Sequence, residues 1–168
     1  DGDVLGHRAY EPNTAAFTQI VETFGSDVVG ADGQINRKAL GGKVFGNPDA
    51  LKQLTDILYP EIRRMFGEWI ETTQSDNPKA LLVMDAAVLL EAGWEDLADE
   101  TWVVIVDPNT AVTRAVTRDG LDEAAVRKRI ASQLSNDERT ARADVVIDNS
   151  RNEAALVARL EAELKRIR

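Results

Sequence analysis

Residues 84–94 read Met84-Asp85-Ala86-Ala87-Val88-Leu89-Leu90-Glu91-Ala92-Gly93-Trp94 and follow an apolar run, Ala80–Val83. This run predicts a buried strand over Ala80–Met84, because continuous apolar character is typical of parallel strands covered on both faces. Ligands of open α/β sheets bind beyond the carboxyl ends of the strands. Asp85 stands where this strand should stop, and Glu91 follows six residues later. Acids at that edge are candidates for magnesium and nucleotide chemistry.

Two further apolar runs predict strands at Trp102–Val106 and Val145–Ile147. Each also ends at an acid, Asp107 and Asp148 respectively. Helical patterns separate the runs, as in repeated strand–helix–strand units. We therefore expect one α/β domain with a parallel sheet and helices on both faces.

Capping signals and apolar spacing indicate where the helices lie. Starts are expected at Asn13, for a helix ending near Phe24, and at Asn47-Pro48, Asp107-Pro108 and Asp122. The helix after Pro48 should break or kink at Pro60, and resume as an apolar stripe. That stripe consists of Ile62, Met65, Phe66, Trp69 and Ile70. The last helix should bury one face, formed by Leu156, Val157, Leu160, Leu164 and Ile167.

Composition excludes several classes of protein. The 168 residues carry a formal net charge of −9, which argues against a broad nucleic-acid surface. Cysteine is absent and His7 is the only histidine, so thiolate zinc sites and histidine triads are excluded. No apolar run approaches the ~20 residues that span a bilayer, and no signal or transit peptide is visible. These features fit a cytoplasmic or mitochondrial protein without membrane or nucleic-acid partners.

The basic residues occur in clusters along the sequence. Such clusters either bind a small phosphorylated ligand or form solvated helix faces. The region Thr117–Ala143 holds six basic residues and few large apolar ones after Ile130, and it lies between two predicted strands. It reads as a charged helical hairpin, either a lid that closes over a phosphate ligand or an ordinary surface hairpin.

Several segments together resemble the dephospho-CoA kinase family, most closely the kinase domain of bifunctional coenzyme A synthase. The matching pieces are Asp1–Asp3, Leu5–Tyr10, Asp32–Leu40, Val44–Asn47, Leu54–Ile57 with Pro60, Asp85–Trp94, Arg118–Leu121 and Ala143–Asn149. The resemblance implies phosphorylation of the ribose 3′-hydroxyl of dephospho-CoA by ATP, the last step of coenzyme A biosynthesis. It also implies Mg²⁺ and a P-loop nucleotide-kinase fold with a five-stranded parallel sheet and a helical lid at about 117–143.

The resemblance implies a role for several residues of the N-terminal half. Asp3 matches the second acid of the family's Asp-x-Asp motif, which ends a strand, and would accept the proton of the acceptor hydroxyl. Asp1 would bind the acceptor or only cap the next helix. Arg37 and Lys38 match a basic motif that would grip the acceptor's phosphate, although Arg37 could instead pair with a nearby acid. His7 would contact or shape the acceptor pocket.

The remaining candidates follow in the second half. Asp85 would hold magnesium or orient the loop beside the phosphates. Glu91 would reach the acceptor site or act as a helix N-terminal acid. Arg118 and Arg139 would be lid arginines over the transferring group and the nucleotide, with Arg127 and Arg142 as weaker candidates. By the same resemblance, the side-chain amide of Asn149 would form hydrogen bonds with the edge of adenine. The alternative is that Asn149 is only a turn residue.

One element of such a kinase is missing from the 168 residues. The Gly-x-x-x-x-Gly-Lys-Ser/Thr loop that cradles phosphates has only a poor imitation, Gly42-Lys43, with Val44 after it. We therefore expect a longer natural protein, with an N-terminally incomplete domain here that lacks its first strand and should be inactive alone. A fused upstream adenylyltransferase domain is left open. The alternatives are a non-catalytic kinase-like binding or scaffold subunit, and another nucleoside monophosphate kinase.

Overall fold

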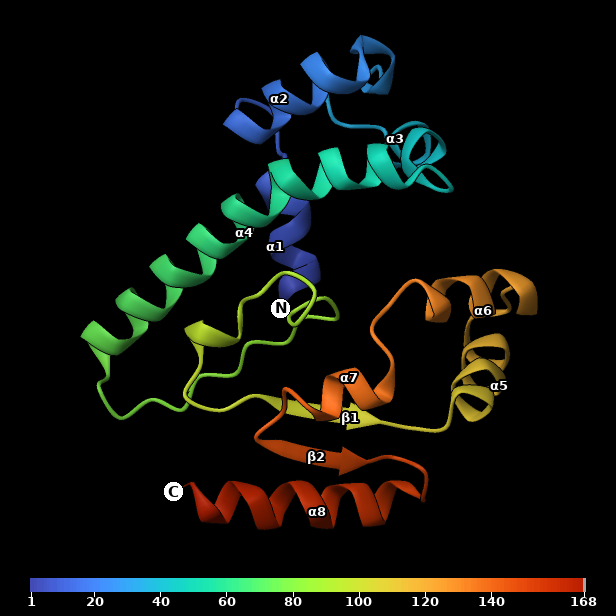
Figure 1. Ribbon diagram of the computed structural model, residues 1–168. Coiled ribbons are helices and arrows are strands. Elements are labelled where there is room, and N and C mark those ends of the chain that lie inside the picture. Colours follow the sequence, from blue (N-terminus) through green and yellow to red (C-terminus); the bar gives the residue numbers. More distant parts are fainter. Residues whose placement is uncertain (168) are drawn as a thin grey trace. The chain divides into compact units, whose positions relative to one another are not determined.

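The computed structural model describes residues 1–167. Its backbone contacts divide the chain into two compact units, Asp1–Ala87 and Val88–Arg168. The first unit is helical and the second holds a parallel sheet with helices (Figure 1). Within the described residues, no helix is both long and apolar enough to cross a membrane.

The long helix α4 organises the first unit. Three shorter helices, α1, α2 and α3, pack against it (Figure 1). The bounds are Gly2–Ala9 for α1, Ala15–Phe24 for α2, Arg37–Val44 for α3 and Pro48–Asp76 for α4, with a 3₁₀ turn, η1, at Ser26–Val28. Apolar residues from α2, η1, the loop before α3, α3 itself and the start of α4 form the core cluster, namely Ile20, Phe24, Val28, Ile35, Leu40, Val44 and Ala50.

The start of α1 differs from the sequence-based expectation. Asp1 and Asp3 were expected at the end of an extended strand, whereas Asp1 is the N-cap of α1 and Asp3 lies in its first turn. The α2 cap is also displaced, because Thr14 rather than Asn13 accepts the N–H of Phe17. Asn13 instead adopts a left-handed conformation with φ of 74°, which asparagine tolerates better than most residues.

A break or a kink was expected at Pro60; helix α4 runs through this residue, so the expected break is wrong. Proline removes one backbone donor, and the carbonyl of Asp56 then loses its helical partner. Both Pro60 and Asp56 are exposed, so water can reach that carbonyl. The expected apolar stripe is buried at Ile62 and Phe66, whereas Trp69 is exposed.

The predicted strand Ala80–Met84 is wrong. These residues have no assigned secondary structure and belong to no ladder among the described residues, and a strand exists only through pairing with a neighbour. Leu81 and Val83 are 50% and 71% exposed, so the run is not buried on both faces.

The second unit is built on two parallel strands, β1 at Trp102–Ile105 and β2 at Val145–Asp148. Their register pairs Trp102 with Val145 and Ile105 with Asp148. The side chain of Asp144 extends the pairing by accepting the N–H of Thr101 at 2.8 Å. Two of the three expected strands are thus confirmed, where the family resemblance implies five.

Five helices accompany these strands. They are the 3₁₀ turn η2 at Glu95–Leu97, α5 at Pro108–Asp119, α6 at Glu123–Ala131, α7 at Asn136–Thr140 and α8 at Glu153–Arg166. Helix α8 lies beside β2 and α7 beside β1 (Figure 1). The expected caps Asp107 and Asp122 are confirmed, since each accepts backbone N–H groups of the helix that follows.

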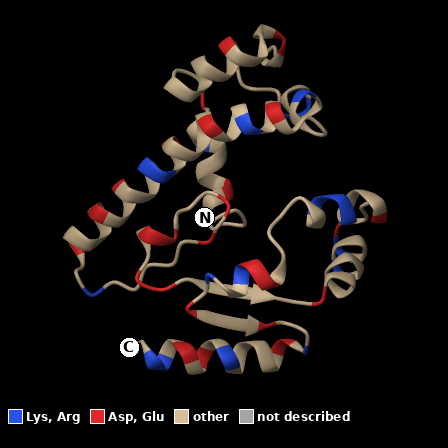
Figure 2. Ribbon diagram, viewed as in Figure 1, with Lys and Arg blue, Asp and Glu red and all other residues tan. Residues whose placement is uncertain are grey.

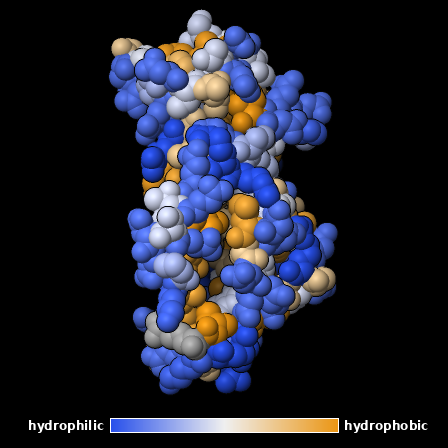
Figure 3. Space-filling view, turned by 90° about the vertical axis from the view of Figure 1, so that its left-hand side faces the viewer, coloured by the Kyte–Doolittle hydropathy of each residue, from blue (hydrophilic) through white to orange (hydrophobic). Residues whose placement is uncertain are grey.

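The sheet is less buried than the sequence predicted, because both faces were expected to be covered by helices. Val104 in β1 is exposed, although Val103 and Ile147 are buried. Of the expected apolar face of α8, Leu156, Leu160 and Leu164 are half-buried, whereas Val157 and Ile167 are exposed. Figure 3 shows hydrophobic residues reaching one face of the molecule in small separate patches.

Ion pairs anchor α8, which carries both signs of charge along its length (Figure 2). Arg166 near its end donates to both carboxylate oxygens of Glu100, at 2.8 and 2.5 Å. The indole N–H of Trp102 donates to the same carboxylate. The hydrogen bonds from Arg166 and then Trp102 lower the pKa of Glu100 from 4.5 to about 2.

We predict that Glu100 contributes stability that is lost in acid. Because its pKa is lower in the folded protein, the contribution is full above pH 4.5 and disappears as pH falls towards about 2. Glu100→Gln should be less stable than wild type at neutral pH, and this difference should shrink over that window. Urea unfolding at a series of pH values measures it. Glu161→Gln, which changes an exposed acid of α8, should show no such pH-dependent difference.

Candidate functional site

The first turn of α1 contacts the segment that carries Asp85. The Gly2 N–H donates to the carbonyl oxygen of Asp85, with an N···O distance of 2.6 Å. A Cβ atom built on Gly2 would lie 2.8 Å from the Cβ of Ala86. The structure therefore brings together the backbones of two predicted site segments, Asp1–Asp3 and Asp85–Ala86, both within the first unit.

Asp1 is engaged as a helix cap. Its Oδ1 accepts the N–H groups of Asp3 at 2.8 Å and Val4 at 3.1 Å. Together with the bond from Gly2, this satisfies the first three backbone donors of α1, which have no partner within the helix. The structural role anticipated for Asp1 is thus present, and these donors have partners other than a phosphate.

The carboxylates of Asp3 and Asp85 are available for chemistry. Both residues are exposed, and among residues 1–167 neither carboxylate has a hydrogen-bond or ion-pair partner. Asp3 follows directly on Gly2, whose N–H holds the Asp85 backbone. Two unpaired acids thus flank one short backbone contact.

Two residues of the predicted acceptor region, His7 and Arg37, lie near Tyr10. The rings of His7 and Tyr10 meet edge to face, with centroids 6.3 Å apart. Burial raises the pKa of the Tyr10 hydroxyl, and the positive charge of Arg37 opposes that rise. Arg37 is the first residue of α3, which the side chain of Asn36 caps through the N–H groups of Lys38 and Ala39. The alternative in which an acid binds Arg37 has no support among the described residues.

Glu91 and Arg139 are brought together in the second unit. An Arg139 nitrogen lies 3.9 Å from a Glu91 carboxylate oxygen and 3.1 Å from the side-chain oxygen of Gln133, to which it donates. Both charged side chains are largely buried, at 22% and 21% exposure. The same Glu91 oxygen accepts the N–H of Leu134 at 3.1 Å. Glu91 lies in a run of turns, which removes one of its two alternatives, that of a helix N-terminal acid.

A second ion pair joins the same two segments. Arg142 donates to Glu95, and this hydrogen bond lowers the pKa of the Glu95 carboxyl. The other Glu95 oxygen is buried and has no hydrogen-bond partner within residues 1–167. The Glu91–Arg139 and Glu95–Arg142 pairs together tie α7 and its flanks to the segment after Val88.

Arg118 is not brought to Arg139. Its guanidinium is 79% exposed and donates twice to the neighbouring Asp119, at 2.7 Å each. It lies at the end of α5, which Gly120 closes in a left-handed conformation. Arg127 lies on α6 and pairs with Glu123. Arg118 and Arg127 thus have exposed partners, unlike Arg139.

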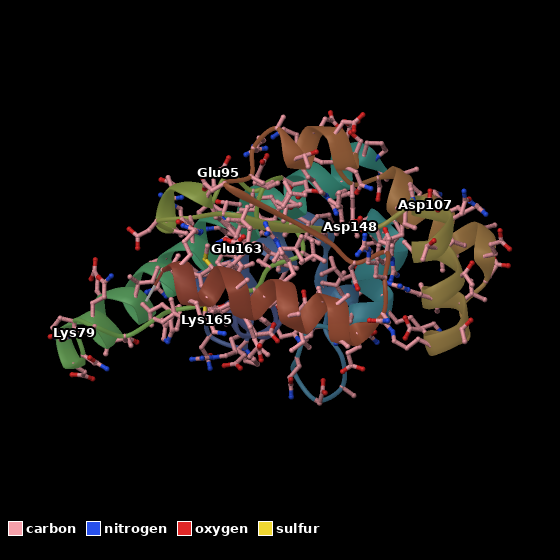
Figure 4. All side chains as sticks on the ribbon, turned by 90° about the horizontal axis from the view of Figure 1, so that it is seen from below. Lys79, Glu95, Asp107, Asp148, Glu163 and Lys165 are labelled. Atoms are coloured by element: carbon pink, nitrogen blue, oxygen red, sulfur yellow. The ribbon has the colours of Figure 1, made fainter. Side chains whose placement is uncertain are left out.

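Asn149 follows β2 and its backbone is fixed on both sides. Its N–H donates to the Ile105 carbonyl at 2.8 Å, and its own carbonyl accepts from Arg114 at 2.8 Å. Its side chain extends from a half-buried position at the carboxyl ends of the two strands. Figure 4 labels Asp107 and Asp148 at this end of the sheet.

The two strand-end acids of the second unit have structural partners. Asp107 caps α5. Asp148 accepts the N–H of Ser150 at 2.8 Å, and this serine lowers the pKa of the Asp148 carboxyl. No cluster of three or more candidate metal ligands exists among the described residues. A metal would therefore rest on few protein ligands, as Mg²⁺ held largely by waters and phosphates does.

Sequence reasoning missed three residues that position the site. Gly2 permits the contact with Asp85, Arg114 fixes the Asn149 turn, and Gln133 holds Arg139. Of these three, only Gly2 could have been noticed in the sequence, because it stands between two predicted site residues, Asp1 and Asp3. The roles of Arg114 and Gln133 depend on contacts between residues far apart in sequence, which no local pattern shows.

Comparison with known proteins identifies relatives over nearly the whole chain. Residues 1–155 match the family model described as dephospho-CoA kinase. A dephospho-CoA kinase from Geobacter sulfurreducens is 41% identical over 162 residues, covering 96% of this chain and 81% of that protein.

Two solved structures share the fold. One from Thermus thermophilus has a TM-score of 0.78 at 28% identity, covering all of this chain and 83% of the other. Dephospho-CoA kinase from Campylobacter jejuni has a TM-score of 0.69 at 26% identity, covering 99% of this chain and 82% of the other. The parallel sheet with its helices thus corresponds to the expected α/β kinase fold.

We predict that Arg37→Gln raises the pKa of Tyr10 further, because it removes the charge that opposes the effect of burial. Absorbance titration of the phenolate measures this in a Tyr59→Phe background, which leaves Tyr10 as the only tyrosine. Lys38→Gln is the matched control and should leave the titration unchanged. An equal shift in both variants, or none in Arg37→Gln, would contradict the placement of Arg37 beside Tyr10.

A second prediction concerns the Glu95–Arg142 pair. Arg142→Gln leaves a carboxylate with a buried oxygen, so the free energy of unfolding should fall by about 1 kcal/mol. Arg118→Gln removes an exposed pair between neighbouring residues, so it should change the free energy of unfolding much less than Arg142→Gln does. Chemical denaturation of both variants makes the comparison. Equal losses would show that the Glu95 pair does not anchor α7.

Proposed function

The chain belongs to the dephospho-CoA kinase family, and we propose that it transfers the γ-phosphoryl group of ATP to the ribose 3′-hydroxyl of dephospho-CoA. The products are CoA and ADP, which makes this the last step of coenzyme A biosynthesis. The observation that carries the proposal is the contact between Gly2 and Asp85, because it joins two segments that each bear an unpaired carboxylate.

Asp3 is the general base in this proposal. A hydroxyl nucleophile must lose its proton as its oxygen bonds to phosphorus, and a carboxylate within hydrogen-bond reach accepts it. Asp3 is exposed and its carboxylate has no partner among residues 1–167, so it can receive a substrate hydroxyl without breaking a protein contact.

Asp85 is the residue we assign to magnesium. Its carboxylate supplies one hard oxygen ligand, which suits a cation that keeps several waters and binds nucleotide phosphates. Bound Mg²⁺ would neutralise charge on the phosphates during transfer. The Gly2 N–H, bound to the Asp85 carbonyl, fixes the backbone from which this carboxylate extends.

The acceptor would bind beside α1 and α3. Arg37 and Lys38 begin α3 and are exposed, so their cationic groups can reach an acceptor phosphate. The ring of His7 packs edge to face against that of Tyr10, so two aromatic rings lie together in the same unit. Asp1 contributes indirectly, because its side chain caps the helix that carries Asp3.

Residues of the second unit have further roles in the proposal. Arg139 would stabilise charge on the transferring group, and Glu91 with Gln133 would hold its guanidinium in place. Arg118 would exchange its exposed partner Asp119 for a phosphate, at little cost. The side-chain amide of Asn149 would pair with the adenine edge through one donor and one acceptor. The segment at about 117–143, which includes α6 and α7, would act as the lid.

We predict that Asp3→Asn in the full-length protein keeps its ATP affinity and loses turnover by about 10²–10⁴-fold, the usual contribution of a general base. Steady-state kinetics and ATP titration measure the two quantities. Glu22→Gln, an exposed acid on α2, is the control and should retain wild-type turnover. Wild-type turnover in Asp3→Asn would exclude Asp3 as the base. ATP binding by a wild-type protein that transfers no phosphate would favour a non-catalytic binding subunit.

A further inference from the structure

We infer that Gly2 is a positioning residue for catalysis, which sets how closely the first turn of α1 approaches the backbone of Asp85 and Ala86. This inference rests on the proposed function, because it concerns the placement of Asp3 relative to Asp85.

Space, not backbone freedom, requires glycine at this position. Gly2 is helical and does not belong to the positive-φ glycines, so its backbone is open to other residues. A Cβ built there would lie 2.8 Å from the Ala86 Cβ, 3.3 Å from the Ala86 Cα and 3.1 Å from the Asp85 carbonyl oxygen. Two of these three atoms are backbone atoms, which cannot rotate away as the end of a flexible side chain can.

The same close approach makes the hydrogen bond short. The Gly2 N–H reaches the Asp85 carbonyl at 2.6 Å. A methyl group on residue 2 would have to displace the first turn of α1 or the backbone at 85–86, and this bond would lengthen in either case. Asp3 lies in the first turn of α1 and Asp85 in the segment that this turn contacts, so a displacement of either would change their separation.

Phosphoryl transfer depends strongly on such placement. A displacement of about 1 Å in a positioned group can cost 10²-fold in rate. In the proposed function Asp85 supplies only one ligand to the Mg²⁺ of the nucleotide, and the other contacts to ATP come from residues that the substitution does not displace. Gly2→Ala should therefore lower kcat much more than it changes the KM for ATP, which a general loss of folding would not produce.

The test compares three variants of the full-length protein. Gly2→Ala should lower kcat by about 10–100-fold, with the KM for ATP within about twofold of wild type. Gly67→Ala is the matched control, because this helical glycine of α4 has no atom within 4 Å of a built Cβ and should keep wild-type kinetics. Adding Ala86→Gly to Gly2→Ala removes the atom 2.8 Å away and should restore most of kcat.

The following results would overturn the proposed role of Gly2. Wild-type kcat in Gly2→Ala would overturn it, and so would a folded Gly2→Ala/Ala86→Gly variant that remains as slow as Gly2→Ala. If Gly2→Ala alone does not fold by circular dichroism, the double variant is compared directly with wild type, and a folded but slow double variant would overturn the inference. A wild-type protein that forms no CoA would instead refute the proposed function, and the inference with it.

Discussion

The hydrogen bond from the Gly2 N–H to the Asp85 carbonyl is the contact on which the candidate site depends. It joins the start of the chain to a segment beyond the long helix α4, and it also occupies a donor that α1 cannot satisfy internally. With that donor and the next two satisfied, the turn is held in place while the Asp3 carboxylate stays unpaired. Asp1 and Gly2 thus have structural roles, and the carboxylates that we propose for catalysis and magnesium binding, those of Asp3 and Asp85, stay unpaired among the described residues.

A similar division operates in the second unit. Glu95 and Arg142 form an anchoring pair, and Glu91, Gln133 and Leu134 surround the position of Arg139. A guanidinium that is only 22% exposed and already held loses less conformational freedom when it meets a phosphate. Arg118, in contrast, is bound only to its neighbour and can change partner freely. The two predicted lid arginines are therefore physically different, one preorganised and one adaptable.

The sequence was most informative where local chemistry decides the structure. The β-branched runs at 102–106 and 145–147 and the caps Asp107 and Asp122 were predicted because each depends on nearby residues. Ala80–Met84 was misassigned because pairing, which no local pattern shows, makes a strand. Asp1–Asp3 was expected to be extended, but the cap at Asp1 makes it helical. Among site residues, Asp3 and Asp85 could be found by type and position, whereas Gln133 and Arg114 could not, since only tertiary contacts give them a role.

The most direct test of the account is to identify the product formed from dephospho-CoA and Mg-ATP by the full-length protein. Tandem mass spectrometry of the product distinguishes phosphate on the ribose 3′-hydroxyl from phosphate elsewhere. We predict CoA, with phosphate on the 3′-hydroxyl, formed over many turnovers and in amounts equal to ADP. ATP consumption without 3′-phosphorylated product, or no reaction by a folded full-length protein, would contradict it.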